Sequence, residues 1–298
     1  MIKTINPKEI SVADFHAYML GAIAPRPIAF VSSMDKEGNV NLSPFSFFNA
    51  FGSNPPLLIF SPARRVRDNT TKHSLENVKE VPEVVVNIVN FAIVQQMSLA
   101  STEYEKGVNE FIKSGLTEVP SKMVRPPRVK EAPVAFECKV REVISVGEEG
   151  GAANLVLCEI LLAHLDEGIL DTFGNIDPRK LDAVARMGGS WYCRANGEAL
   201  FQIDKPVKNK GIGVDQIPER IRRSVVLTGN DLGKLGNVES LPAEESASVY
   251  GETAAMEEMR IRFQNDPESH IFHLHQFAHE LLKDGKVEEA WLVLLQFY

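Results

Sequence analysis

The order of apolar and polar positions predicts that the first two thirds of the chain is built from β-strands. Residues 134–140 alternate between apolar and small or polar side chains, which is the period of a half-buried strand. Residues 84–89 are strongly β-branched, as strands prefer. The predicted strands and extended runs are 28–33, 40–51, 57–60, 84–89, 134–140 and 154–165. With so little helix between them, they predict a mainly β fold, an antiparallel barrel and not a doubly wound sheet.

Short helices and turns are expected around these strands. Ser11 is placed to cap a helix that Gly21 ends. The segment 24–27 alternates alanine, proline and arginine, and each proline keeps its predecessor extended. A second helix is expected over 74–80, and a glycine-rich turn at 147–151 joins the last two strands as a hairpin.

The pattern changes near residue 200. Residues 201–204 are predicted to form a last strand, and 205–213 form a basic, glycine-bearing linker. Beyond it the strand pattern fades, and helices are expected over 254–263, 271–282 and 287–295, the last two as an αα-hairpin. We therefore predict a barrel domain over 1–204 and a helical C-terminal extension over 205–298.

Composition and charge narrow the class of function. The 298 residues include 32 basic and 40 acidic side chains, a net charge of -8, which disfavours a nucleic-acid binder. No window approaches the roughly 18 apolar residues of a membrane span, and the first ten residues do not resemble a secretory signal. The three cysteines form no CxxC pair, so we expect reduced thiols in a cytoplasmic protein. Neither GxGxxG nor a P-loop is present.

Hydroxyl and cationic side chains gather in three segments that the predicted fold places near one another. Ser32 and Ser33 end one strand, Asn41 to Phe47 follow on the next, and Lys72 to Ser74 open a helix. A helix start with its free N–H groups, a lysine and several hydroxyls together could hold a phosphate. Taken singly, each is commoner as a strand end or a helix cap.

Six motifs occur in an order that resembles the flavin reductase-like, FMN-binding split-barrel family. The first three are PRPIAFVSS at 25–33, GNVNLSPFS at 38–46 and the two prolines at 55–56. KHSLENV at 72–78 is similar to the family's Lys-Asp-Thr-x-x-Asn-Ile, although His73 replaces the usual aspartate, and Val86-Asn87 follows it. His164 after a long strand and RMGGSWY at 186–192 complete the series, which spans about residues 10 to 200.

The resemblance implies a homodimer that binds FMN near its subunit interface and reduces it with hydride from NADH or NADPH. Physically, a flavin phosphate needs cations and N–H donors, and its ring needs a flat apolar wall. His164 would be catalytic on the nicotinamide side, with a partly buried strand-end histidine as the alternative. The cofactor-binding residues that it implies are Arg26, Ser32, Ser33, Asn41, Ser43, Ser46, Phe47, Lys72, Ser74, Arg186, Gly188 and Gly189. The phosphate and the ribityl chain would be faced by Ser32, Ser33, Lys72 and Ser74. The flavin ring would be lined by Asn41, Ser43, Ser46 and Phe47. The pocket would be closed by Arg186 and the two glycines.

Two other functions stay open. One is an FMN-binding protein without turnover, whose C-terminal helices cover the nicotinamide site or recruit a partner; the other is a pyridoxamine-phosphate-oxidase-type barrel. A reductase would pass its electrons to a small-molecule acceptor or a partner oxygenase. The four histidines between 270 and 279 do not form an HExxH motif, so no metal site is predicted there, and an amphipathic interface helix is favoured.

Overall fold

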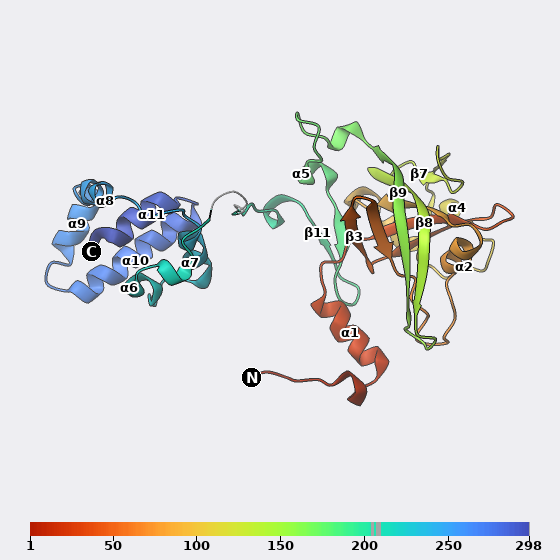
Figure 1. Ribbon diagram of the computed structural model, residues 1–298, viewed down its shortest axis with the longest axis horizontal. Coiled ribbons are helices and arrows are strands. Elements are labelled where there is room, and N and C mark those ends of the chain that lie inside the picture. The colour runs from red at the N-terminus through yellow and green to blue at the C-terminus, as the bar shows by residue number, and fades with distance from the viewer. Residues whose placement is uncertain (204–205, 207–209, 298) are drawn as a thin grey trace. The chain divides into compact units, whose positions relative to one another are not determined.

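A computed structural model describes residues 1–203, 206 and 210–297 of the chain (Figure 1). It divides into two compact units, Met1–Phe201 and Gln202–Tyr298. The expected domain boundary, between residues 204 and 205, lies outside the described residues. Each unit has its own buried apolar cluster.

The first unit is built on one seven-stranded antiparallel sheet with the strand order β2-β1-β5-β8-β9-β4-β3. Its strands are β1 (Ala29–Met34), β2 (Val40–Phe45), β3 (Phe48–Ser53), β4 (Pro56–Phe60), β5 (Glu83–Ile88), β8 (Val134–Val146) and β9 (Ala153–Leu165). Two small pairs accompany it, β6 (Glu118–Val119) with β7 (Arg128–Val129) and β10 (Val184–Arg186) with β11 (Tyr192–Arg194).

Chain connectivity closes this sheet into a split barrel. β2 and β3 are the two edge strands, yet only Ser46 and Phe47 join them. From the last residue of β2 to the first of β3 there are only three Cα–Cα steps, which span about 11 Å at most, so the sheet must curl until its edges meet at this corner. The predicted mainly β fold, an antiparallel split barrel with peripheral helices, is confirmed. The expected extended run 40–51 is broken at the same corner.

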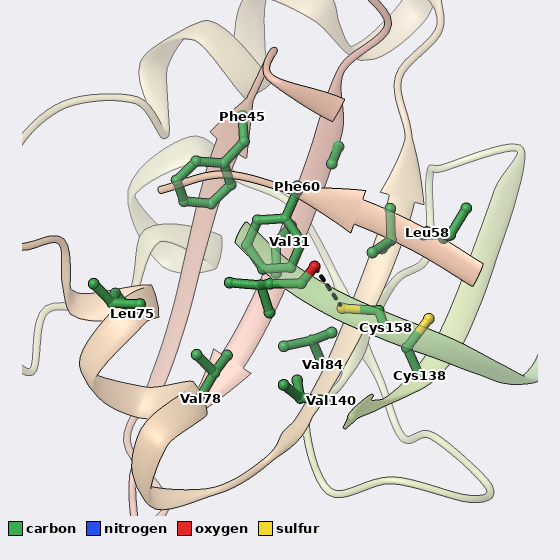
Figure 2. Packing of buried hydrophobic residues seen from close by; sticks show 13 residues of the cluster. Val31, Phe45, Leu58, Phe60, Leu75, Val78, Val84, Cys138, Val140 and Cys158 are labelled. Atoms are coloured by element: carbon green, nitrogen blue, oxygen red, sulfur yellow. Dashed lines mark hydrogen bonds between the residues drawn. The ribbon is translucent and has the colours of Figure 1, made fainter. Parts of the chain in front are cut away.

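The barrel interior is filled by one apolar cluster (Figure 2). Val31, Phe60 and Val84 are completely buried in it, and α2 (His73–Glu80) adds Leu75 and Val78 from outside the sheet. Its further members include two free cysteines, Cys138 and Cys158. Burial raises the pKa of the Cys138 thiol to about 12, so this thiol stays protonated and unreactive at neutral pH.

A second cluster covers the outer face of β1. Phe30 points into it and packs with Met97 and Phe111 from the helices that follow β5. The helices of this unit are α1 (Val12–Ala22), α2, α3 (Val94–Leu99), α4 (Glu110–Ser114) and α5 (Pro178–Leu181). Ser11 caps α1 by accepting a hydrogen bond from the Asp14 N–H, as predicted, and the helix ends one residue beyond Gly21.

The second unit is all-helical among its described residues. Its helices are α6 (Glu219–Arg222), α7 (Gly229–Gly236), α8 (Glu244–Gly251), α9 (Ala254–Arg262), α10 (Pro267–Lys283) and α11 (Val287–Leu294). The predicted hairpin of α10 and α11 is confirmed, and the completely buried Trp291 of α11 lies in the core that the hairpin helps to form. The predicted strand over 201–204 is wrong where it is described, because residues 201–203 have no strand partner; Asp204 lies outside the described residues.

Three helices of the second unit were not predicted. α6 is only four residues long and α8 begins without a side-chain cap, so neither shows a clear helical signal. α7 begins with a capping box made by Thr228 and Asp231, but its three glycines weaken its helical preference. Within the described part of the chain, no helix is long and apolar enough to cross a bilayer.

Candidate functional site

A cavity of about 440 Å³ opens where β2 turns into β3. This size is within the usual range of small-molecule sites. The corner supplies Ser46 and Phe47, the loop after β4 supplies Ser61 and a run of arginines, and α2 supplies Lys72 at its N-cap. The complete lining is His16, Pro44, Phe45, Ser46, Phe47, Ser61, Ala63, Arg64, Arg65, Val66, Arg67, Lys72, Glu103 and Gly151.

Lys72 is a half-buried cation with a free ammonium group. Among the described residues, no hydrogen bond or ion pair reaches its Nζ, which lies over the Phe45 ring at 5.6 Å from the centroid. Burial, and then the charge of Arg65, lowers the pKa of Lys72. An ammonium that is held without a counter-ion in a cavity is suited to bind an anion from solution.

Three arginines extend the positive charge along the loop after β4. Arg64 is fixed by two hydrogen bonds to Asn69, from Nε at 2.6 Å and from Nη2 at 2.5 Å. Arg65 Nε donates to Glu103 at 2.9 Å, and Arg67 also pairs with Glu103. The cavity therefore holds three arginines and a lysine against one carboxylate, in a chain whose net charge is -8.

The remaining lining fits a ligand with both an anionic and an aromatic part. The hydroxyl of Ser61 is buried in the lining and has no hydrogen-bond partner among the described residues. A buried hydroxyl without a partner costs free energy unless a ligand or water completes it. Phe45 and Phe47 provide apolar surface in the same cavity. Cations and a hydroxyl suit a phosphate, and the phenyl rings suit a flat heterocycle, so the residues fit a flavin mononucleotide.

Asn41 and Ser74, both predicted to contact the cofactor, lie in a buried network next to the cavity and not in its lining. The Ser74 hydroxyl donates to Asn41 Oδ1 at 2.6 Å, and Asn41 Nδ2 donates to Glu110 Oε1 at 2.8 Å. Glu110 Oε2 accepts from the Leu42 N–H at 2.8 Å. Burial raises the pKa of Glu110. The network joins β2, α4 and the first turn of α2, and so fixes the N-terminus that carries Lys72.

The other three serines predicted from the strands are not in the lining either. Ser32 is completely buried and donates to the carbonyl of Pro127. Ser33 is also completely buried, and its Oγ accepts from Asn77 Nδ2 at 3.1 Å. Ser43 is half-buried within β2, opposite Val31. The strand pattern located these residues correctly on β1 and β2, but it did not show which face of the barrel each one occupies.

Arg26 and the segment around Arg186 form a separate structural group at the end of α1. The Arg26 guanidinium donates to the carbonyls of Leu20 and Ile23, both at 2.5 Å, and to that of Met187 at 2.8 Å. Its Nε lies 3.4 Å from Ser46 Oγ, and this contact joins the group to the cavity. The Arg26 guanidinium thus donates its hydrogen bonds to the C-terminal end of α1 and to the turn at Met187.

The turn itself is tight. Arg186 lies over the Tyr192 ring, 4.6 Å from the centroid, and donates to the Gly189 carbonyl at 2.8 Å. Gly189 adopts a φ of +57°, and a Cβ on Gly188 would come within 3.1 Å of the Gly21 Cα. The left-handed backbone of Gly189 and the close approach of Gly188 to Gly21 thus favour glycine at both positions, with or without a ligand.

His164 lies at the far end of β9 from the hairpin that borders the cavity. Its Nε2 is 2.6 Å from Oε1 of the completely buried Glu137, whose oxygens also accept the N–H groups of Lys122 and Met123. Burial raises the pKa of Glu137, but these hydrogen bonds lower it by more, so the net shift is downward. Within one chain the structure does not bring His164 to the cavity.

Several lining residues were not predicted as site residues. Arg64, Arg65 and Arg67 lie in a loop that the sequence showed to be basic, and three arginines within four residues beside a lysine were the available signal. Ser61 and Glu103 carried no such signal. Glu103 is 36 residues from Arg67 in the chain, so only the fold could place it there.

Comparison with known proteins places the first unit among flavin proteins. A family model described as "Flavin reductase like domain" matches residues 20–181. An uncharacterized protein of Aquifex aeolicus is 38% identical over 196 residues, which are 66% of this chain and 97% of that protein. The structure of nitrilotriacetate monooxygenase component B from Bacillus cereus superposes with a TM-score of 0.64, at 31% identity over 68% of this chain and 99% of its own. The structure of 2-nitrobenzoate 2-nitroreductase NbaA from Pseudomonas fluorescens superposes with a TM-score of 0.58, at 27% identity. The match covers 68% of this chain and 96% of that protein.

Proposed function

The chain belongs to the flavin reductase-like domain family, and from that premise we propose that it binds FMN in the cavity of its first unit. We propose further that it reduces this FMN with NADH or NADPH. The observation that supports the proposal is the unpaired Lys72 ammonium, which lies beside an arginine loop and a phenyl wall in one cavity.

In this proposal the cations hold the phosphate. Lys72 donates directly, since no residue that the structure describes makes a hydrogen bond or an ion pair with its ammonium, which lies over the Phe45 ring. Arg65 and Arg67 exchange Glu103 for a phosphate oxygen, a replacement of one charge-assisted hydrogen bond by another. Ser61 completes the set with a hydroxyl whose hydrogen-bonding capacity is unused in the described residues.

The aromatic residues and the barrel corner orient the ring. Phe45 is held against Phe60, with ring centroids 5.2 Å apart, so the part of this buried side chain that lines the cavity is a rigid wall. Ser46 and Phe47 lie where the two sheet edges meet and offer main-chain groups to the polar edge of a heterocycle. A flavin held by these residues would supply the redox chemistry itself, which is hydride acceptance from a reduced nicotinamide and transfer of two electrons to an acceptor.

The acceptor and the assembly are part of the proposal. The similarity to a monooxygenase component B supports transfer of reduced flavin to a partner oxygenase. The similarity to a nitroreductase supports a small organic acceptor as the second possibility. We propose a homodimer as the working assembly, which light scattering of the purified chain tests directly.

Visible spectroscopy tests the central proposal. The purified protein is saturated with FMN, freed of oxygen and titrated separately with NADH and NADPH. The proposal expects loss of the flavin absorbance with one of the two nucleotides, at one equivalent per flavin. Bound FMN that neither nucleotide reduces would leave an FMN-binding protein without this turnover. Absence of FMN binding would refute the proposal.

A further inference from the structure

The tip of the β8–β9 hairpin borders the cavity of the first unit, and the proposed function gives it no role. The tip consists of residues 147–152, and Gly151 is part of the cavity lining. Opposite the tip lies the arginine loop, residues 61–71, which connects β4 to α2 and carries the three arginines of the cavity. The contacts between the tip and the loop therefore affect where these cations lie.

Hydrogen bonds to the loop main chain join the two segments. The Arg64 N–H donates to the Ala152 carbonyl at 2.9 Å, and the Gly151 N–H donates to the Arg64 carbonyl at 3.1 Å. Asn154 on β9, which is only 4% exposed, donates from Nδ2 to the Pro62 carbonyl at 3.2 Å. The hairpin thus fixes the first half of the arginine loop from one side.

Gly150 brings the tip into direct contact with the next part of the loop. A Cβ on this residue would lie 2.9 Å from the Val66 carbonyl oxygen and 3.2 Å from that of Arg65. An ordinary contact begins at 3.4 Å, so an added methyl group would push the two segments apart by about half an ångström. The φ of Gly150 is not in the left-handed region, so glycine is needed here for space and not for its backbone angles.

The segment that Gly150 touches carries two of the cavity's cations. Val66 lies between Arg65 and Arg67, and both of these arginines pair with Glu103. A displacement of the Val66 peptide therefore moves the backbone of both side chains. Charge-assisted hydrogen bonds require donor and acceptor to be about 2.7–2.9 Å apart, and a binding site tolerates errors of about 0.5 Å. The close packing at Gly150 is thus relevant to the binding of an anion by this loop.

We propose that Gly150 is a positioning residue of the phosphate site. It acts through the main chain of Val66, because its missing side chain lets the arginine loop approach the hairpin closely enough for Arg65 and Arg67 to meet the phosphate. Asn154 supports the same arrangement through its hydrogen bond to Pro62. The inference rests on the proposed binding of FMN and adds to it that the hairpin tip sets the affinity for the phosphate.

Comparison of FMN with riboflavin tests the proposal in the variant Gly150→Ala. Riboflavin has the same ring and ribityl chain without the phosphate. Quenching of flavin fluorescence at fixed ionic strength measures both Kd values. We expect the Kd for FMN to rise about five- to tenfold, since two charge-assisted hydrogen bonds are weakened, and the Kd for riboflavin to stay within about twofold. A merely structural role of Gly150 would weaken both flavins alike.

Hydrogen exchange of the ligand-free protein gives a second measurement that does not involve flavin. Peptides within residues 61–71 should exchange at least about threefold faster in Gly150→Ala, because the bond from the Arg64 N–H to Ala152 opens more often. Gly233→Ala is the matched control. Gly233 is exposed on α7 of the second unit, its backbone is not left-handed, and an added Cβ would meet nothing within 4 Å. Neither the flavin affinities nor the exchange of the arginine loop should change in this control.

The outcomes separate this inference from the proposed function. A parent protein that binds FMN no more tightly than riboflavin would refute the phosphate site, and the inference with it. A parent protein that prefers FMN, together with a Gly150→Ala variant that keeps the same preference, would overturn the inference alone. Equal weakening of both flavins, or unchanged exchange of the arginine loop, would also overturn it, with urea denaturation confirming that the variant is folded.

Discussion

Replacement of Lys72 by methionine separates the anion-binding role of this side chain from its effect on stability. The ammonium has no hydrogen bond or ion pair among the described residues, so its removal breaks no internal contact except that with the Phe45 ring. A hydrogen bond to a charged group contributes about 1.5–3 kcal/mol. Three arginines remain in the cavity and compensate in part, so we expect the Kd for FMN to rise about 10- to 100-fold.

The same substitution should not destabilise the free protein. Burial and Arg65 lower the pKa of Lys72, which means that folding disfavours its charged form. This cost is present at pH 7 and at every pH below the folded pKa, and it fades as the pH rises toward the unfolded value of 10.5. Lys72→Met removes the cost, so its urea midpoint at pH 7 should equal or exceed that of the parent protein.

Lys79→Met is the matched control for this experiment. Lys79 lies on the same helix, is exposed, does not line the cavity, and changes the net charge by the same amount. FMN affinity is measured for both variants by quenching of flavin fluorescence at fixed ionic strength. If the Kd values of the two variants agree within twofold, Lys72 does not bind the phosphate and the reasoning from its unpaired ammonium is wrong.

Three further substitutions test the electrostatics and the core. Glu103→Gln should lower the Kd for FMN up to about fivefold, since it frees two arginines from an exposed ion pair; a higher Kd would contradict the exchange of counter-ions. Asp231→Asn should cost about 2 kcal/mol of unfolding free energy at pH 7. Burial raises the pKa of Asp231, but hydrogen bonds from Thr228 and His279 lower it by more, so the net shift is downward. The stabilisation is therefore present above the unfolded pKa near 3.8, and it is lost as the pH falls through the lower folded pKa. Urea denaturation at several pH values between about 2 and 7 measures this cost. A cost that does not change with pH would contradict the assigned role of the Asp231 carboxylate. Trp291→Ala should cost about 3–5 kcal/mol in the second unit, and the flavin spectrum of the first should not change.

Local sequence patterns were sufficient for most elements of the barrel. The β-branched run at 84–89 and the alternation at 134–140 became β5 and the first half of β8, because strand preference and burial acted in the same direction there. Ser11 capped α1 as predicted, since a cap is made by neighbours three residues apart. In the glycine-rich α7 the capping pair of Thr228 and Asp231 was a local signal of a helix start, and packing against Trp291 adds the stabilisation that three glycines do not provide.

The candidate site was less predictable than the fold. Motif order pointed to the corner with Ser46, Phe47 and Lys72, and the structure brings these three together. It assigns Ser32, Ser33, Asn41 and Ser74 to buried hydrogen bonds instead, because a strand has two faces and a motif does not show which one meets the cavity.

Sequence patterns were enough to predict the β-rich barrel, the helical second unit and the presence of cationic and hydroxyl side chains in three ordered segments. These are short-range properties, set by periodicity, turn chemistry and composition. Tertiary packing determines that Arg65 and Arg67 share Glu103, while no hydrogen bond or ion pair from the described residues reaches the Lys72 ammonium. Those outcomes depend on contacts between residues that are distant in the chain, and such contacts form only when the sheet closes and the helices pack.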